Sequence, residues 1–233
     1  MHSPDRLQVV SLDLDDTLWA IAPVLRSAEH HLWRWLKARC PRVVARHSPH
    51  ALRERRERIA ADRPDRRHDL GWLRRQTLVE VLNECGYRSD TLPDEAMAVF
   101  VAARSDVQPW PDVRPALARL KARYTVVALT NGNADLAATG LSPWFDHCLS
   151  AADVGAAKPD AAMFDALLCA TGARAEAVLH AGDDPVADVA GAREAGMHAV
   201  WINRDARPWP TGQPPAHWEV TDLLALVQRL DPA

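Results

Sequence analysis

Four short clusters of polar residues punctuate this 233-residue chain, and each follows an apolar run or precedes a helical pattern. They are Asp13-Leu14-Asp15-Asp16-Thr17, Thr130-Asn131-Gly132-Asn133, Lys158-Pro159 and the segment from Gly182 to Asp188, which contains three further acids. Acids that repel one another become tolerable around a hard cation such as Mg²⁺, which prefers oxygen ligands. Lysine supplies a point charge suited to phosphate, while a hydroxyl and open backbone amides can hold phosphate oxygens.

This combination of groups fits phosphoryl transfer, in which positioning and charge neutralisation provide most of the catalysis. A carboxylate can itself be the nucleophile and form an aspartyl-phosphate. Thr130 and Gly132, ahead of a helix, offer the hydroxyl and the backbone amides. The clusters therefore predict an enzyme that acts on a phosphate ester, provided that the fold brings them together.

The segments around the clusters alternate between strand and helix patterns. Apolar runs predict strands at 7–14, 124–130, near 148–149, 177–181 and 198–202. Helical spacing predicts helices at 113–123, 159–171, after Pro185, and at about 222–230, with a loop at 203–217. The alternation predicts an α/β fold, a Rossmann-like parallel sheet with helices on both faces. The carboxyl ends of parallel strands meet at one edge, where ligands bind, so the clusters should converge there.

A long helical insertion separates the first predicted strand from the second. From about residue 21 to 104, apolar residues recur at helical spacing and no strand pattern occurs. We predict a catalytic core of residues 1–18 and 108–233 and a helical cap of residues 19–107. Because the insertion leaves the sheet at its expected ligand edge, the cap is a candidate lid.

Taken in order, the clusters resemble the motifs of the haloacid dehalogenase superfamily, in its phosphatase branch with a helical type 1 cap. Matching positions are Asp13, Asp15 and Thr17 for the first motif, Thr130 for the second, Lys158 for the third, and Gly182, Asp183 and Asp188 for the fourth. The resemblance implies that Asp13 is the nucleophile and Asp15 the general acid and base. It also implies that Thr130 and the Asn131 amide bind phosphate and that Lys158 neutralises charge.

The same resemblance implies a Mg²⁺ cofactor. Asp13, the backbone carbonyl of Asp15, and Asp183 would hold the ion, with Asp184 and Asp188 contributing directly or through water. The dehalogenases that gave the superfamily its name need no Mg²⁺ and lack the second acid of the first motif. The presence of Asp15 therefore favours a phosphatase over a haloacid dehalogenase. A receiver-like module that only accepts phosphate on an aspartate is a third alternative, but such modules are about half this length and have no lid.

Several features are similar to those of bacterial flavin mononucleotide phosphatases, which also act on the phosphorylated riboflavin precursor. The similarity covers the first motif with its aromatic Trp19, the second and fourth motifs, and the segment His68–Arg75. Trp19 and Trp72 would face a flat ring and Arg74 a phosphate or a ring edge, although a tryptophan in a helical domain more often belongs to the core. Phosphoglycolate, a sugar phosphate and a nucleotide remain alternative substrates.

Composition bears on the binding partners and the cellular location of the protein. The net charge of −3 gives no field that points to nucleic acid or membrane, and we expect a small-molecule phosphate ester as partner and a monomer or homodimer. The start of the chain has no apolar stretch typical of a signal peptide, and the four cysteines lack metal-site spacing, so we expect a cytoplasmic protein with reduced thiols. Cys148 and Cys169 are expected in the core.

Overall fold

The computed structural model describes residues 7–231 and divides into two compact units. The core unit comprises Met1–Ala20, Gln108–Gly132 and Gly140–Ala233, and the helical unit comprises Ile21–Val107 and Asn133–Thr139. The segment 133–139, which we had assigned to the core, groups with the helical unit, where the Asp135 amide donates to Ser105 Oγ at 2.9 Å. The first six residues, where the sequence predicts no signal peptide, lie outside the described part.

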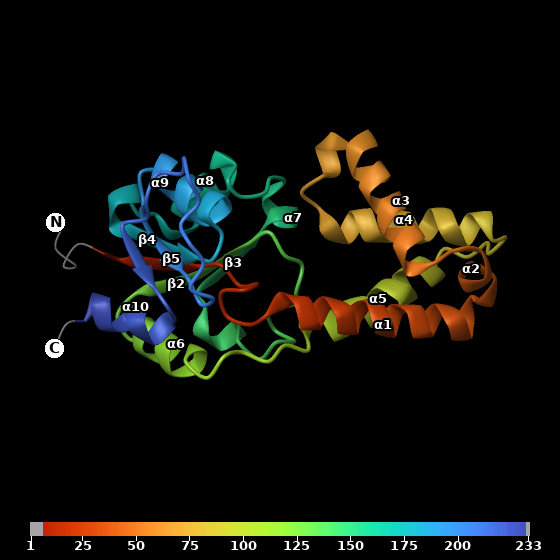
Figure 1. The fold of residues 1–233 in the computed structure, drawn as a ribbon, viewed down its shortest axis with the longest axis horizontal. Coiled ribbons are helices and arrows are strands. Elements are labelled where there is room, and N and C mark those ends of the chain that lie inside the picture. The colour runs from red at the N-terminus through yellow and green to blue at the C-terminus, as the bar shows by residue number, and fades with distance from the viewer. Residues whose placement is uncertain (1–6, 232–233) are drawn as a thin grey trace. The chain divides into compact units, whose positions relative to one another are not determined.

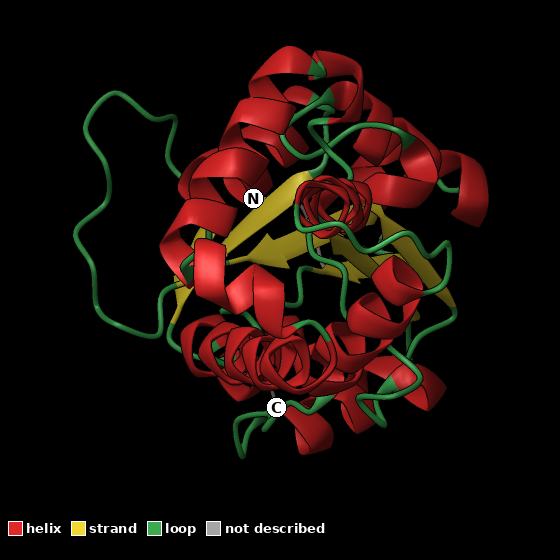
Figure 2. Ribbon diagram, turned by 90° about the vertical axis from the view of Figure 1, so that its right-hand side faces the viewer, coloured by secondary structure: helices red, strands yellow, loops and turns green. Residues whose placement is uncertain are grey.

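The core unit is built on one six-stranded sheet, drawn in yellow in Figure 2. Its order is β3-β2-β1-β4-β5-β6 and each neighbouring pair is parallel. The bounds are β1 Val9–Leu12, β2 Thr125–Thr130, β3 His147–Ser150, β4 Val178–Gly182, β5 His198–Ile202 and β6 Trp218–Val220. The predicted parallel α/β fold is confirmed. Because β1 is central, the loop that follows it lies between the ends of β2 and β4.

Helices cover both faces of this sheet (Figure 1). On one face lie α6 and α10, which contact each other, and on the other lie α7, α8 and α9. The bounds are α6 Val113–Lys121, α7 Ala151–Val154, α8 Ala161–Thr171, a π-helix at Pro185–Ala190, α9 Gly191–Glu194 and α10 Leu223–Leu230, with 3₁₀ turns at Ser142–Trp144 and Ala175–Ala177. Phe164, Val189 and Trp201 belong to the buried cluster under α8 and α9. Their burial fixes the sheet against the segment that carries the fourth motif.

The helical unit has its own core. It consists of α1 Ile21–Arg39, α2 Pro41–Arg46, α3 Pro49–Asp62, α4 Leu70–Glu84 and α5 Leu92–Ser105, with a 3₁₀ turn at Pro64–Arg66. The α1 helix packs along α5, and α4 contacts both α3 and α5. Leu36, Leu78 and Phe100 are buried between them. The start of α3 is fixed by its sequence, since Pro49 occupies the first turn and Ser48 Oγ accepts from the Ala51 amide.

Two expectations fail in the core unit. The short strand β6 lies at an edge of the sheet and was absent from the prediction, because three residues give no readable alternation. Cys148 and Cys169 are exposed rather than buried, although all four cysteines are free thiols. Cys148 lies on the edge strand β3, and Cys169 points outward from α8.

Among the described residues, no helix combines the length and the apolar character needed to span a membrane.

Candidate active site

The loop after β1 presents the first motif. Asp13 is held in register with β4 by its amide, which donates to the Ala181 carbonyl at 3.0 Å. The chain then turns tightly: Asp16 takes a positive φ of 56° and its amide donates to the Trp19 carbonyl at 2.8 Å. The Trp19 indole Nε1 donates to Asp15 Oδ1 at 3.0 Å. The turn thus holds the Asp15 carboxylate in one orientation next to Asp13.

Lys158 lies at the centre of the site and is 5% exposed. Its ammonium nitrogen Nζ donates to Asp13 Oδ1 at 2.8 Å, to Asp188 Oδ1 at 2.7 Å and to the Leu129 carbonyl at 2.6 Å. Burial opposes a charged ammonium, but the carboxylates of Asp13 and Asp188 outweigh it and raise the pKa of Lys158. The lysine is therefore cationic and brings the first, third and fourth motifs together.

Asp188 is fixed by partners on three sides. Besides Lys158, its Oδ1 lies 3.2 Å from His180 Nε2, and its Oδ2 accepts from the Asp184 amide at 2.9 Å. Burial lowers the pKa of His180, so the imidazole is neutral. Since an ionised carboxylate only accepts, Nε2 carries the proton, and Nδ1, 3.0 Å from Ser11 Oγ, accepts from that hydroxyl. Burial would raise the pKa of Asp188, but Lys158 and then His180 lower it, so its carboxylate is ionised.

The glycine of the fourth motif makes room for Asp188. A Cβ on Gly182 would lie 2.2 Å from Asp188 Cγ, a distance that no side chain tolerates. Any larger residue at the end of β4 would displace Asp188 from Lys158. The requirement for glycine at this position is thus steric.

Asp183 follows Gly182 and is bound through its backbone. The Trp201 indole donates to its carbonyl at 2.8 Å, and Arg207 Nη2 donates to the same carbonyl at 3.0 Å and to Asp183 Oδ2 at 3.3 Å. A pocket of about 160 Å³ opens here, lined by Asp16, Trp110, Asp183 and Arg207 among others. Asp183 therefore faces an accessible space within the core unit.

Carboxylate oxygens of Asp13, Asp183 and Asp188 lie within 4.8 Å of one another. Burial, together with the charge of Asp188, raises the pKa of Asp183 to about 7, and burial raises that of Asp13 to about 8 against the opposing effect of Lys158. A divalent cation among these oxygens would favour the ionised forms of both groups. The residues present therefore fit a Mg²⁺ ion, whose ligands are oxygens.

The second motif follows β2 and is hydrogen-bonded to the backbone of Lys158. Thr130 is buried at the end of β2, and its Oγ1 accepts from the Gly132 amide at 2.9 Å. The Asn131 side chain bonds the backbone of Lys158 twice, accepting from its amide at 2.7 Å and donating to its carbonyl at 2.9 Å. This pairing ties the second and third motifs together. The Gly132 amide, predicted as a phosphate donor, already has the threonine hydroxyl as its acceptor.

Asp184 has a different position from the other acids of its motif. Its Oδ1 accepts from the Val186 and Ala187 amides at 2.7 and 2.9 Å, which caps the π-helix that begins at Pro185. The three-carboxylate cluster does not include it. These bonds give Asp184 a structural role in holding the motif. Its contribution to the metal site, directly or through water, stays a prediction.

Comparison with known proteins identifies the family of the chain. Residues 7–196 match the family of haloacid dehalogenase-like hydrolases. The chain belongs to this family. A relative from Escherichia coli strain K12, the 5-amino-6-(5-phospho-D-ribitylamino)uracil phosphatase YigB, is 27% identical over 95% of both chains. The phosphoserine phosphatase of Thermus thermophilus is 36% identical over 59% of this chain and 57% of its own.

Solved structures of haloacid dehalogenase-like hydrolases share the fold. A 2-haloacid dehalogenase from Pseudomonas syringae pv. Tomato DC3000 is 38% identical and superimposes with a TM-score of 0.90. The alignment covers 96% of this chain and 98% of that chain. A magnesium-bound hydrolase from Bacillus subtilis, YfnB, has a TM-score of 0.63 at 21% identity, covering 97% of this chain and 99% of its own. The predicted family is confirmed, and the relatives include both phosphatases and dehalogenases.

Three residues predicted to bind substrate have side chains that contact other groups of the protein in this structure. Trp19 has no exposed surface, and its indole donates to Asp15, so no ring face is open in this structure. In the helical unit, Trp72 lies under Arg63 and Arg66, whose guanidinium carbons are 5.1 and 5.6 Å from its ring centre. Arg74 is 8% exposed and stacks on Phe100 at 3.7 Å.

Several residues of the site were not found from the sequence. One is His180, whose bond to Asp188 no local pattern predicts. Arg204 and Arg207 come from a Pro-rich loop after β5 whose local pattern predicts only a turn region. Their functional contacts depend on tertiary structure, since each reaches a motif far away in the sequence.

Proposed function

We propose that the chain is a Mg²⁺-dependent phosphatase that hydrolyses a small phosphorylated metabolite through an aspartyl-phosphate. The observation that carries the proposal is the pairing of Asp13 with Lys158 beside a cluster of three carboxylates, with Asp15 two residues away. The identity to phosphatases supports the same reaction.

Each group has a place in the reaction. Asp13 attacks phosphorus, and Asp15 transfers its proton to the leaving alkoxide oxygen as the P–O bond breaks. Asp15, now ionised, removes a proton from a water that attacks the aspartyl-phosphate, which releases phosphate and restores Asp13. Lys158 offsets the charge on Asp13 throughout. Asp13, Asp183 and Asp188 would hold Mg²⁺, which would supply charge neutralisation for the phosphoryl oxygens.

Flavin mononucleotide and the phosphorylated riboflavin precursor are the substrates we favour. The support is the E. coli relative, a phosphatase of that precursor that aligns over nearly the full length of both chains. Phosphoglycolate, sugar phosphates and nucleotides test the breadth of the preference, since the phosphoserine phosphatase relative acts on a smaller ester.

A haloacid dehalogenase is the second candidate, because the P. syringae structure with a TM-score of 0.90 is described as one. Halide is the anion of a strong acid and leaves without a proton, so that reaction needs no general acid. An alkoxide does need one. Asp15, oriented by Trp19, has a clear task in phosphate ester hydrolysis and none in halide departure.

The deciding experiment measures phosphate release from a metabolite panel with Mg²⁺ and, in parallel, chloride release from 2-chloropropionate. The panel contains flavin mononucleotide, phosphoglycolate, a sugar phosphate and a nucleoside monophosphate. Asp13→Asn should reduce phosphate release by at least about a thousandfold, since it removes the nucleophile. Wild-type-like turnover in that variant would refute the nucleophile assignment.

Asp15→Asn separates the two candidates. We expect phosphate release to fall by about a hundredfold or more, the usual contribution of a general acid. Chloride release that exceeds phosphate release and survives Asp15→Asn would establish the dehalogenase instead.

A further inference from the structure

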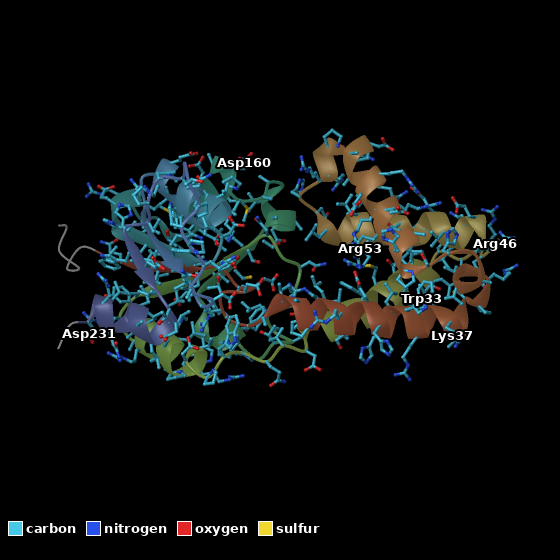
Figure 3. All side chains as sticks on the ribbon, in the orientation of Figure 1. Trp33, Lys37, Arg46, Arg53, Asp160 and Asp231 are labelled. Atoms are coloured by element: carbon cyan, nitrogen blue, oxygen red, sulfur yellow. The ribbon has the colours of Figure 1, made fainter. Side chains whose placement is uncertain are left out.

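The helical unit contains a pocket of about 40 Å³ between α1, α3 and α4. Leu32, Leu36 and Leu78 give it apolar walls, and Trp33 lies at its side. Figure 3 labels Trp33 on α1 and Arg53 on α3, which both line it. All lining residues belong to the helical unit, and none of them belongs to the carboxylate cluster of the core unit.

The charged side chains that line this pocket include more positive than negative groups. Three guanidinium groups, of Arg53, Arg56 and Arg74, line it together with a single carboxylate, Glu29. Glu29 Oε2 accepts from Arg53 at 3.2 Å, and its Oε1 is 4.0 Å from Arg74. One acid therefore serves two arginines, and within residues 7–231 Arg56 has no carboxylate within ion-pair distance.

Burial makes this excess of positive charge costly. The Arg74 side chain is 9% exposed, and burial followed by the charge of Arg56 lowers its pKa to about 9. Burial also lowers the pKa of Arg56. A bound anion would supply counter-charge beyond the single Glu29 carboxylate that the described residues place in the pocket.

We propose that this pocket binds a small oxyanion, through the guanidinium groups of Arg53, Arg56 and Arg74. The planar fork of arginine matches a carboxylate or a phosphate, each of which can accept two parallel hydrogen bonds. The volume of the pocket limits the size of the ligand. One water needs about 10–15 Å³ of such a cavity, so the pocket has room for only a few waters. Inorganic phosphate and a small dicarboxylate meet that limit, whereas a nucleotide does not.

Calorimetric titration of the metal-free full chain with inorganic phosphate, and separately with malonate, tests the proposal. Arg56→Gln is the informative variant, because Arg56 makes no ion pair with any described residue whose loss would disturb the fold. Arg58→Gln is the matched control: it removes the same charge from the same helix at an exposed position outside the pocket. We expect one binding event in the wild type to be weakened at least about tenfold by Arg56→Gln and unchanged by Arg58→Gln.

The two probes identify the source of the oxyanion. Tighter binding of phosphate indicates a phosphoryl ligand, and tighter binding of malonate a carboxylate ligand; either result supports the pocket. Identical isotherms for the wild type and both variants would overturn the proposal, because any phosphate bound would then lie elsewhere, as at Lys158. The readout is binding rather than turnover, so it does not depend on the proposed phosphatase activity.

Discussion

Asp15 owes its orientation to a residue four positions later. Trp19 is completely buried, and its single polar atom donates to Asp15 Oδ1 at 3.0 Å. The turn between them is closed by the bond from the Asp16 amide to the Trp19 carbonyl. We interpret Trp19 as a positioning residue that keeps Asp15, the proposed general acid and base, aligned with Asp13, the proposed nucleophile.

Trp19→Phe tests this role, because it keeps the buried ring but removes the donor. We expect kcat for phosphate release to fall about tenfold, a fraction of the contribution of general acid catalysis, with KM changed less than about twofold. Trp209→Phe removes an indole donor from the loop after β5, where it bonds Gln213, and should leave kcat unchanged. A rise in KM at constant kcat would instead favour the ring-stacking role predicted from the sequence.

Asp183 makes a pH-dependent contribution to stability when no metal is present. Its folded-state pKa, raised to about 7, exceeds the ordinary value of 3.8, so the folded protein holds the proton more tightly than the unfolded chain. Stability from this group is full below pH 4 and is lost as the pH rises through 7. Asp183→Asn removes that loss.

We therefore expect Asp183→Asn to melt a few degrees above the wild type in EDTA at pH 8, and to lose this advantage at pH 5. Mg²⁺ should raise the Tm of the wild type and not that of the variant, which lacks a ligand. Thermal melts at the two pH values, with and without Mg²⁺, measure both effects. Equal Tm gains from Mg²⁺ in the two proteins would remove Asp183 from the metal site.

At the scale of elements, one arginine connects the catalytic loop to two helices. Arg204, on the loop after β5, donates to the Thr17 carbonyl at 3.0 Å and forms a two-point pair with Asp112 at 2.8 and 3.1 Å. Asp112 in turn accepts from the Leu223 amide at the start of α10, at 2.9 Å. The loop that carries the first motif is thus anchored to the starts of α6 and α10.

Arg204→Lys should loosen this anchor, because an ammonium cannot reproduce the planar two-point contact. We expect a loss of about 1–3 kcal/mol in the free energy of unfolding, from hydrogen bonds to charged partners in a largely buried setting. Urea denaturation measures the loss. Arg229→Lys, on α10 beyond this network, is the control. An equal loss of stability in both variants would show that the Arg204 contacts do not contribute specifically to the free energy of unfolding.

The sequence predicted those elements whose signals are local. The strands at Val9–Leu12, Thr125–Thr130 and His198–Ile202 were expected within a few residues, because buried parallel strands are short apolar runs bounded by turns. The residues that orient the motifs were not predicted. Arg204, Arg207 and His180 act across distances of 8 to 187 residues in the chain, and no local pattern marks them.

At the scale of the whole molecule, charge is divided unevenly along the chain. Residues 34–75, which lie in the helical unit, contain 14 Lys or Arg and 5 Asp or Glu, a net charge of +9. Since the entire chain has a net charge of −3, the remainder carries −12. The acidic catalytic site would by itself repel a phosphate ester, whereas the basic segment 34–75 attracts one.

This division predicts a salt-dependent encounter with anionic substrates. Raising the ionic strength from about 10 mM to about 150 mM shortens the Debye length from about 30 to about 8 Å, which screens charges far from the reacting groups. We expect kcat/KM for a phosphate ester to fall several-fold while kcat, measured at saturation, stays constant. Steady-state kinetics at constant free Mg²⁺ gives both values. The double variant Lys37→Gln with Arg58→Gln, two exposed charges of the helical unit, should show a shallower dependence on salt than the wild type. A fall of kcat in parallel with kcat/KM would place the effect of salt in the chemical step, because steering alters only the rate of encounter.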